Sequence, residues 1–98
     1  MMKRNAYVIV RSARAGVFAG TLVSRDGQAV KMKNVRRIWY WDGAASISQL
    51  AVHGVSKPKN CKFSVVTPEH NVFEVIEIIP CTQAAQGIIE SVPVWNAQ

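Results

Sequence analysis

The sequence predicts a small α+β domain, with about six mostly antiparallel strands and two short helices. The chain of 98 residues is long enough for one domain, residues 1–98, around one core. β-Branched and aromatic runs separated by turn signals fill the N-terminal part of the chain. Segments with helical spacing follow later, and because the strands cluster in hairpins the pattern indicates an α+β domain or a small half-open barrel rather than a doubly wound sheet.

Four strands are predicted in the N-terminal part, and they follow one another as hairpins. The turn between the second and the third contains Asp26 and Gly27, a pair that supplies the positive φ of hairpin turns. Gly20 indicates a bulge or a close backbone approach, and Asn34 is predicted to break or bulge the sheet. The four strands are Tyr7–Ser12, Val17–Ser24, Ala29–Lys33 and Val35–Trp41.

The rest of the chain is predicted to combine two helices with shorter strands. The first helix is predicted over Ala44–His53, with Ile47, Leu50 and Ala51 on one face. The order of the four meandering strands, first basic and then aromatic, suits a half-open barrel of the SH3 or Sm kind. The remaining predicted segments are a loop at Val55–Asn60, a strand at Lys62–Val66, a turn at Thr67–Asn71, a strand at Val72–Ile79, a helix at Thr82–Ser91 and a tail at Val92–Gln98.

Charge is distributed unevenly along the chain, whose net charge is +6. Residues 1–37 contain nine Lys or Arg and one acidic residue, a balance of +8. Residues 38–62 contribute +2, and residues 63–98 contribute −4 because they have four Glu and no basic residue. This split predicts either an anion-binding front with an acidic back or a self-complementary surface that joins protomers. A soluble basic protein without an anionic partner is the alternative.

Several classes of protein are not indicated by this sequence. No apolar run has the length of a membrane helix, and the stretch after Met1–Asn5 is too short for a secretory signal, so a cytoplasmic protein without membrane contact is expected. Cys61 and Cys81 are expected to be reduced thiols, and with His53 and His70 they lack the usual zinc spacing. We therefore expect no metal, no cofactor and, without any catalytic motif, no enzyme.

The predicted strand Val35–Trp41 contains the first candidate ligand-binding residues. Alternation in a strand places Arg37, Trp39 and Trp41 on one face and Arg36 on the other. Indoles beside a guanidinium form a platform on which nucleobases stack, while arginine binds phosphate with its planar fork. The alternative is that Trp39 and Trp41 belong to the core or to an interface between protomers, which is favoured for either indole taken alone.

A second group, Ser46, Ser48 and Gln49, lies near the start of the first predicted helix. Free backbone amides at a helix start, together with hydroxyl groups, bind anions. The simpler alternative for Ser46 is an N-cap that needs no ligand.

The third group consists of Lys57, Lys59 and Lys62 in a segment stiffened by Pro58. Lysines in such a segment can close over a phosphate, but a solvated loop is the more common outcome. Arg14–Gly16 is a fourth and weaker anion nest.

Several blocks of the sequence resemble a family of short phage and prophage proteins of unassigned function. The blocks are RRIWYWDGAASISQLAVHG, KPKNCKF, GVFAGTLVSRDG and VPVW, and the resemblance covers nearly the whole chain. It implies a viral origin and the cytoplasm of a bacterial host. It implies no reaction and assigns no site residue.

Together these observations give one leading hypothesis and two alternatives. The leading hypothesis is an accessory or counter-defence phage protein that sequesters a small anionic, nucleotide-like ligand in a homo-oligomer. The first alternative is a nucleic-acid-binding protein, since basic residues accompany aromatic ones. The second is a protein inhibitor or virion assembly component that uses the aromatic strand as its interface.

Overall fold

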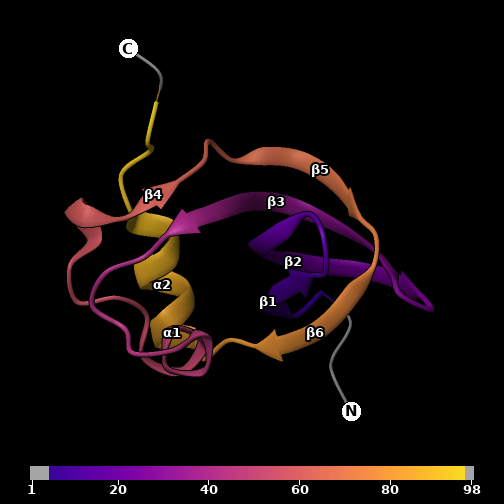
Figure 1. The fold of residues 1–98 in the computed structure, drawn as a ribbon, viewed down its shortest axis with the longest axis horizontal. Coiled ribbons are helices and arrows are strands. Elements are labelled where there is room, and N and C mark those ends of the chain that lie inside the picture. The colour runs from indigo at the N-terminus through magenta and orange to yellow at the C-terminus, as the bar shows by residue number, and fades with distance from the viewer. Residues whose placement is uncertain (1–4, 97–98) are drawn as a thin grey trace.

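One antiparallel sheet and two helices form the domain (Figure 1). The structure is a computed structural model that describes residues 5–96, so positions 1–4 of the predicted N-terminal segment and 97–98 of the predicted tail lie outside the described residues. The elements are β1 (Tyr7–Ser12), β2 (Gly16–Asp26), β3 (Ala29–Tyr40), α1 (Ile47–His53), the 3₁₀ helix η1 (Pro58–Asn60), β4 (Lys62–Phe63), β5 (Thr67–Val72), β6 (Val75–Pro80) and α2 (Gln83–Ser91). The predicted α+β class is confirmed.

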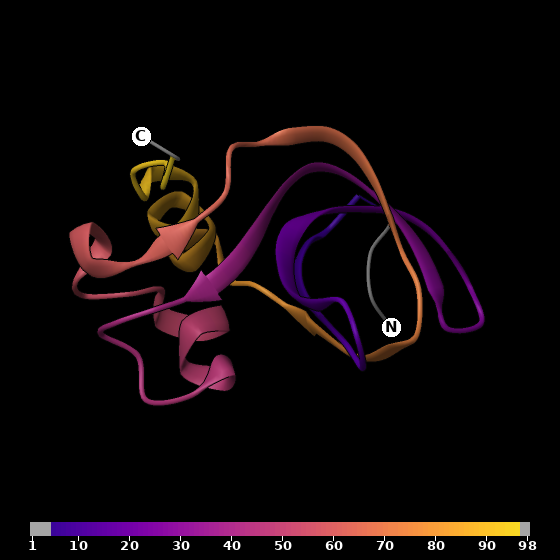
Figure 2. The same cartoon turned by 45° about the horizontal axis from the view of Figure 1, so that its top comes forward.

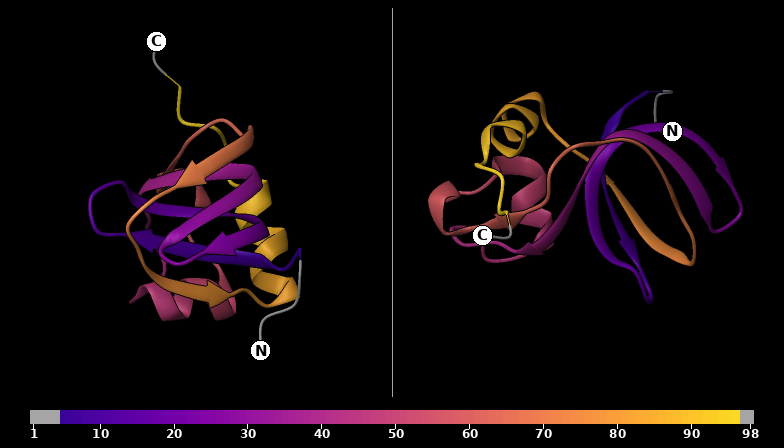
Figure 3. Two further views of the ribbon diagram at one scale, coloured as in Figure 1. Left: turned by 90° about the vertical axis from the view of Figure 1, so that its right-hand side faces the viewer. Right: turned by 90° about the horizontal axis from the view of Figure 1, so that it is seen from above.

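The sheet curls so that its two end strands meet at one turn. Its order is β4-β3-β2-β1-β6, and β5 also pairs with β3. β5 and β6 are consecutive in the chain, yet they lie at opposite ends of the path β5-β3-β2-β1-β6. Phe73 and Glu74 join them, and the sheet curls around while remaining one open sheet (Figures 1 and 3). The SH3-like or Sm-like barrel stays a prediction.

The interior strand β1, which lies between β2 and β6, is buried on both faces and separates two hydrophobic clusters. Tyr7 and Ile9 point toward the helices, whereas Val8 and Val10 point into the curl of the sheet. The helix-side cluster contains Tyr7, Ile9, Ala19, Ile38, Leu50, Ala51, Val55, Cys61, Phe63, Ile89 and Val92. The inner cluster contains Val8, Val10, Phe18, Leu22, Val30, Met32, Val35, Val72 and Val75.

The two strands predicted on either side of Asn34 form a single strand, β3. Asn34 adopts a left-handed conformation with φ 53°, and the register between β2 and β3 shifts between Ala19 and Thr21. Gly20 lies at this irregularity, where a Cβ atom would come within 3.0 Å of Val35 Cγ2. The close backbone approach predicted at Gly20 is therefore confirmed, and the irregularity bends β3 without ending it.

The predicted turn at Thr67–Asn71 is wrong, because these residues belong to strand β5. β5 pairs with β3 from Val72 opposite Val30 to Thr67 opposite Val35. Pro68 is tolerated because β5 is an edge strand, where a missing N–H need not break a ladder. The chain turns instead at Glu74, whose φ is 56°, and this splits the predicted strand Val72–Ile79.

The two helices pack against each other and against one face of the sheet (Figure 2). α1 starts three residues later than predicted, after the N-cap Ser46, and α2 starts after the N-cap Thr82 as expected. Leu50, Ala51 and Ile89 bury the helices in the helix-side cluster. No helix within residues 5–96 is long and apolar enough to cross a membrane.

Candidate functional site

Arg37 lies at the open mouth of the curled sheet, on the face of β3 that carries the inner cluster. It pairs across the strands with Phe18 of β2, and its guanidinium carbon lies 4.8 Å from the centre of the Phe18 ring. Its Nε is buried and finds no hydrogen-bond acceptor among residues 5–96. An unpaired buried donor costs about 1–3 kcal/mol, so an acceptor supplied by a ligand would recover that free energy. Arg37 is therefore the centre of the candidate site.

A first hollow of about 190 Å³ lies on one side of Arg37 and is called here the polar hollow. It is enclosed by the connection between β1 and β2, by the end of β5 and by the turn at Phe73 and Glu74. Its size suits a single small group, because sites for whole small molecules measure about 300–1,000 Å³. Its lining residues are Ser12, Arg14, Ala15, Phe18, Arg37, His70, Asn71, Val72, Phe73 and Glu74.

A second hollow of about 170 Å³ adjoins the first and is called here the aromatic hollow. The two share Arg37 and His70, and the remaining lining residues of the second are Trp39, Ser64, Val65 and Thr67. Trp39 is 54% exposed and meets Trp95 edge to face, with ring centroids 5.4 Å apart. Lys62 Nζ lies 5.2 Å from the centre of the Trp95 ring. A planar group bound in the hollow would contact the Trp39 indole beside the Arg37 guanidinium.

His70 of β5 separates the two hollows and is half-buried. Its ring lies 5.0 Å from that of Phe18, and its Nδ1 lies 3.2 Å from Thr67 Oγ1. Burial, followed by the charge of Arg37, lowers the pKa of His70 below its ordinary value. At neutral pH the imidazole is therefore uncharged, and Arg37 supplies the positive charge at the boundary between the hollows.

Arg36 does not belong to this site, although it was among the expected ligand-binding residues. Its side chain crosses to the helix side and is only 2% exposed. Its Nε donates to the carbonyl of Ser64 at 2.9 Å, and its Nη1 donates to those of Ile89 at 2.9 Å and Val92 at 2.7 Å. Arg36 thus satisfies the carbonyls at the end of α2 and holds the helix to the sheet.

Trp41 and two of the three lysines also lie apart from the hollows. β3 ends at Tyr40, and Trp41 turns to pack against the helix-side cluster. Lys57 and Lys59 are exposed on the segment around η1. This segment is docked by Asn60 Nδ2, which donates to Asp42 Oδ2 at 3.1 Å. Of the three predicted lysines, only Lys62 approaches the aromatic hollow, through Trp95.

The segment around η1 packs so closely against the residues before α1 that position 43 has no room for a side chain. The φ of Gly43 is 95°, and a Cβ atom there would lie 2.5 Å from the backbone nitrogen of Ser56 and 2.7 Å from that of Lys57. The small-residue stretch before α1 therefore accommodates the chain's own backbone.

The predicted group at the start of α1 acts as a helix cap. Ser46 Oγ accepts from the backbone of Gln49 at 3.1 Å, and Gln49 Oε1 accepts from the backbone of Ala45 at 2.6 Å. Ser46 is therefore an N-cap, as the simpler alternative predicted, and Gln49 binds the backbone of the residue before the cap. Ser48 is exposed on α1, outside both hollows.

Sequence reasoning placed Arg37 and Trp39 in the site but missed several of their neighbours. His70 and Thr67 lie on β5, which was predicted as a turn, and Trp95 lies in the predicted tail. Val94 forms a parallel bridge with Phe63, and this bridge brings the tail beside β4. Arg14 was noticed only as part of a weak anion nest. Alternation of Val72 with His70 was the one signal that β5 is a strand.

Metal-binding and thiol chemistry find little support in the described part of the chain. Residues 5–96 contain no group of three or more His, Cys, Asp or Glu side chains placed to hold a metal ion. Cys61 and Cys81 are both free thiols. Burial raises the pKa of Cys81 to about 11, which keeps the thiol protonated and unreactive at neutral pH.

Comparison with known proteins identifies a family but no characterised relative. Residues 5–89 match the family described as a domain of unknown function (DUF6948). No curated protein and no solved structure matches the chain.

Proposed function

Because the chain belongs to the DUF6948 family, whose function is unknown, its role has to come from its own site, and we propose that it binds a small nucleotide-like anion without converting it. The observation that carries this proposal is Arg37, a guanidinium with a buried, unpaired Nε between two adjoining hollows. In this proposal the anionic group contacts Arg37 from the polar hollow. The planar group lies in the aromatic hollow against Trp39.

The chemistry of the two hollows supports a ligand with two unlike ends. The polar hollow contains two arginines, whose planar donors suit phosphate oxygens. The aromatic hollow contains Trp39 and Val65, which suit the face of a base. Each hollow is too small for a whole nucleotide, but the two meet at Arg37 and His70, so one ligand can occupy both.

Binding of single-stranded nucleic acid is the second candidate function. Trp39 and Trp95 are both about half exposed, and Lys62 lies over Trp95, so the aromatic platform continues onto open surface. Such a platform accommodates successive bases with little sequence preference. The affinity would then fall steeply with salt as counterions are released, whereas a small ligand held by one or two arginines depends less on salt.

The biological setting of the proposed binding follows from the resemblance to short phage proteins. A protein that holds a nucleotide-like signal without turnover would sequester it in the cytoplasm of an infected host, as an accessory or counter-defence factor. A homo-oligomer fits the same proposal, because Trp39 and Val65 are exposed and line the same hollow, so they offer an apolar surface for a second copy. The competing use of this surface is an interface with a host or virion protein.

Calorimetry with a panel of linear and cyclic nucleotides tests the proposed function. We expect binding to the wild-type protein, loss of binding in Arg37→Gln, and a loss of about 1–3 kcal/mol in Trp39→Ala, the free energy of one base–aromatic stack. Tyr40→Ala is the matched control, because Tyr40 is 50% exposed on the same strand but lines neither hollow. The proposal is refuted if the folded wild-type protein binds no member of the panel.

A further inference from the structure

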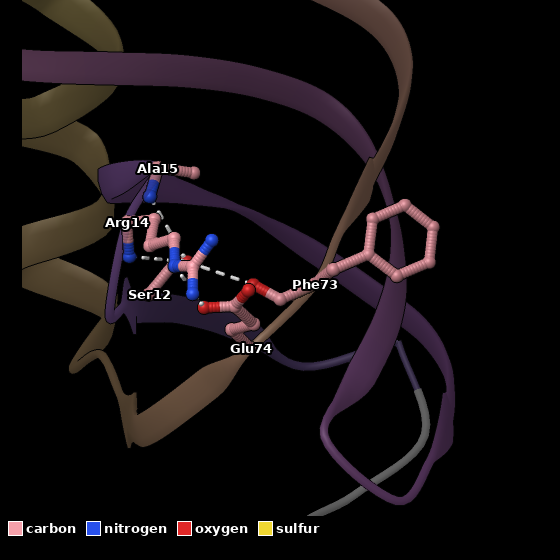
Figure 4. Close-up of polar contacts among 5 residues, drawn as sticks. All are labelled: Ser12, Arg14, Ala15, Phe73 and Glu74. Carbon is pink, nitrogen blue, oxygen red and sulfur yellow. Dashed lines mark hydrogen bonds and ion pairs between the residues drawn. The ribbon is translucent and has the colours of Figure 1, made fainter.

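Arg14 and Arg37 both line the polar hollow, but they differ in their partners. Arg14 Nε lies 3.2 Å from Glu74 Oε2, across the gap between the β1–β2 connection and the turn before β6 (Figure 4). Arg37 makes no ion pair among residues 5–96. The polar hollow therefore holds two guanidiniums and one carboxylate.

The ion pair between Arg14 and Glu74 is weakly held. Their side chains are 86% and 46% exposed, and an exposed pair contributes only about 0–1 kcal/mol. An anion with more negative charge than a carboxylate can replace Glu74 beside Arg14 at little cost in free energy, because the Glu74 side chain can rotate away and be hydrated.

Backbone contacts hold the two loops together even when this ion pair opens. Ser12 Oγ donates to the carbonyl of Phe73 at 2.7 Å and accepts from the backbone of Ala15 at 3.1 Å (Figure 4). The backbone N–H of Ala13 donates to the carbonyl of Glu74 at 2.9 Å. Both loops are thus fixed by bonds that do not involve the side chains of Arg14 or Glu74. Only those side chains have to move when a ligand arrives.

We propose that the polar hollow is a subsite for a terminal phosphate monoester, which displaces Glu74 from Arg14 and is held between Arg14 and Arg37. This inference rests on the proposed function and narrows its ligand class. A monoester carries a charge of about −1.5 to −2 at neutral pH and matches two guanidiniums. A phosphate diester carries one negative charge, and Arg37 alone balances it while Glu74 stays on Arg14. Glu74 is therefore the residue that discriminates between the two classes.

Calorimetry with adenosine 5′-monophosphate, inorganic phosphate and 3′,5′-cyclic adenosine monophosphate tests the subsite. We expect the monoester to bind more tightly than the cyclic diester. Glu74→Gln should raise the affinity for the monoester about two- to fivefold, the worth of one exposed ion pair. Arg14→Gln should lower it about fivefold or more, and Glu74→Gln should have no further effect in the Arg14→Gln background, as a double-mutant cycle reveals.

Two matched controls separate the subsite from the general charge of the protein. Glu69→Gln removes a carboxylate that pairs with Lys31 at 3.7 Å on β5, outside the hollow. Arg11→Gln removes a guanidinium of β1 that pairs with Glu77 of β6 at 2.9 Å, outside the hollow. We expect both to bind the monoester like the wild-type protein.

The possible failures of the two proposals are distinguishable. The subsite is overturned if Glu74→Gln behaves like Glu69→Gln, if Arg14→Gln behaves like Arg11→Gln, or if the monoester binds no more tightly than the diester. Loss of all binding in Arg37→Gln would still support the proposed function in those cases. If the folded wild-type protein binds none of the three probes, the subsite is refuted and the proposed function loses its principal support.

Discussion

Arg36 and Arg37 are neighbours in sequence, but the alternation of β3 directs their side chains to opposite faces of the sheet. Arg36 points to the helices and donates to three backbone carbonyls, although its Nη2 is buried without a partner. Arg37 points to the open mouth, and its Nε is likewise unpaired. The sequence predicted the alternation correctly. It could not show which face would be covered, because that depends on where α2 packs.

The structural role of Arg36 leads to a prediction about stability. Arg36→Ala should lower the free energy of unfolding by about 2–4 kcal/mol, because it leaves the carbonyls of Ile89 and Val92 buried without a donor. Urea denaturation measures the change. Arg25→Ala is the control, since Arg25 is exposed and makes one short-range bond to Gly27. Equal stability of the two variants would contradict the anchoring role.

Two weakly acidic side chains, the half-buried Cys81 and the buried Tyr7, predict a loss of stability at alkaline pH. Burial raises the pKa of Cys81 from 9.0 to about 11, and burial followed by the charge of Glu90 raises that of Tyr7. Above pH 9 the thiol ionises in the unfolded chain but keeps its proton in the folded one. The stability should therefore be unaffected by Cys81 below pH 9 and fall between pH 9 and 11, by at most about 1.4 kcal/mol per pH unit for this group.

Denaturation at several pH values checks this dependence. Cys81→Ala should make the alkaline decline shallower, and Tyr7→Phe should do so at still higher pH. Tyr7→Phe should cost little stability at pH 7, because the Tyr7 hydroxyl is buried without a partner among residues 5–96. Identical pH profiles of Cys81→Ala and the wild-type protein would contradict the assignment.

At the scale of elements, the well-predicted strands are those that pack through their own side chains. β1 matches its predicted bounds because four consecutive apolar residues fill both clusters. β5 was missed because its sequence, TPEHNV, contains turn-forming residues, and only its pairing with β3 makes it a strand. The residues of the candidate site differ in predictability for the same reason. Arg37 and Trp39 were predicted from one strand, while His70 depends on a long-range pairing that no local pattern encodes.

The junction between the β1–β2 connection and the β5–β6 turn depends on Ser12. Ser12 is buried, donates to the carbonyl of Phe73 and accepts from the backbones of Arg14 and Ala15. Ser12→Ala should therefore lower the free energy of unfolding by about 1–3 kcal/mol. Thermal denaturation beside Ser24→Ala, an exposed serine in β2, checks this. A variant as stable as Ser24→Ala would show that the junction is held without the hydroxyl.

At the scale of the whole molecule, the basic N-terminal part of the chain and its acidic C-terminal part form ion pairs with each other. The three ion pairs among residues 5–96 each join a basic residue of the N-terminal half to a glutamate of the C-terminal part. One prediction from the sequence was that opposite charges would attract between protomers. These opposite charges already attract within one chain. Arg37 takes part in none of these ion pairs and lines both hollows, so its charge is available to a ligand.

Because these ion pairs are all exposed, salt should affect stability and binding differently. Raising sodium chloride from about 0.05 to 0.5 M should change the free energy of unfolding by less than about 1 kcal/mol. The affinity for a nucleotide should fall over the same range, since its phosphate meets at least one unpaired guanidinium. Denaturation and calorimetry at both concentrations test this. A large loss of stability would show that the ion pairs hold the sheet together.

The place of β6 beside β1 has a consequence for the order in which the protein is made. Val8 of β1 lies opposite Pro80 of β6, and Arg36 donates to the carbonyl of Val92. Both interactions need residues that are synthesised much later than their partners. β1 therefore pairs with β2 early in synthesis, but it gains its second neighbour only after Pro80 has been added to the chain. Pairings between residues so distant in sequence slow folding. Until they form, the backbone groups and apolar side chains of β1 that β6 will cover remain exposed. The protein is therefore most prone to aggregation during its synthesis, before α2 has packed against the sheet.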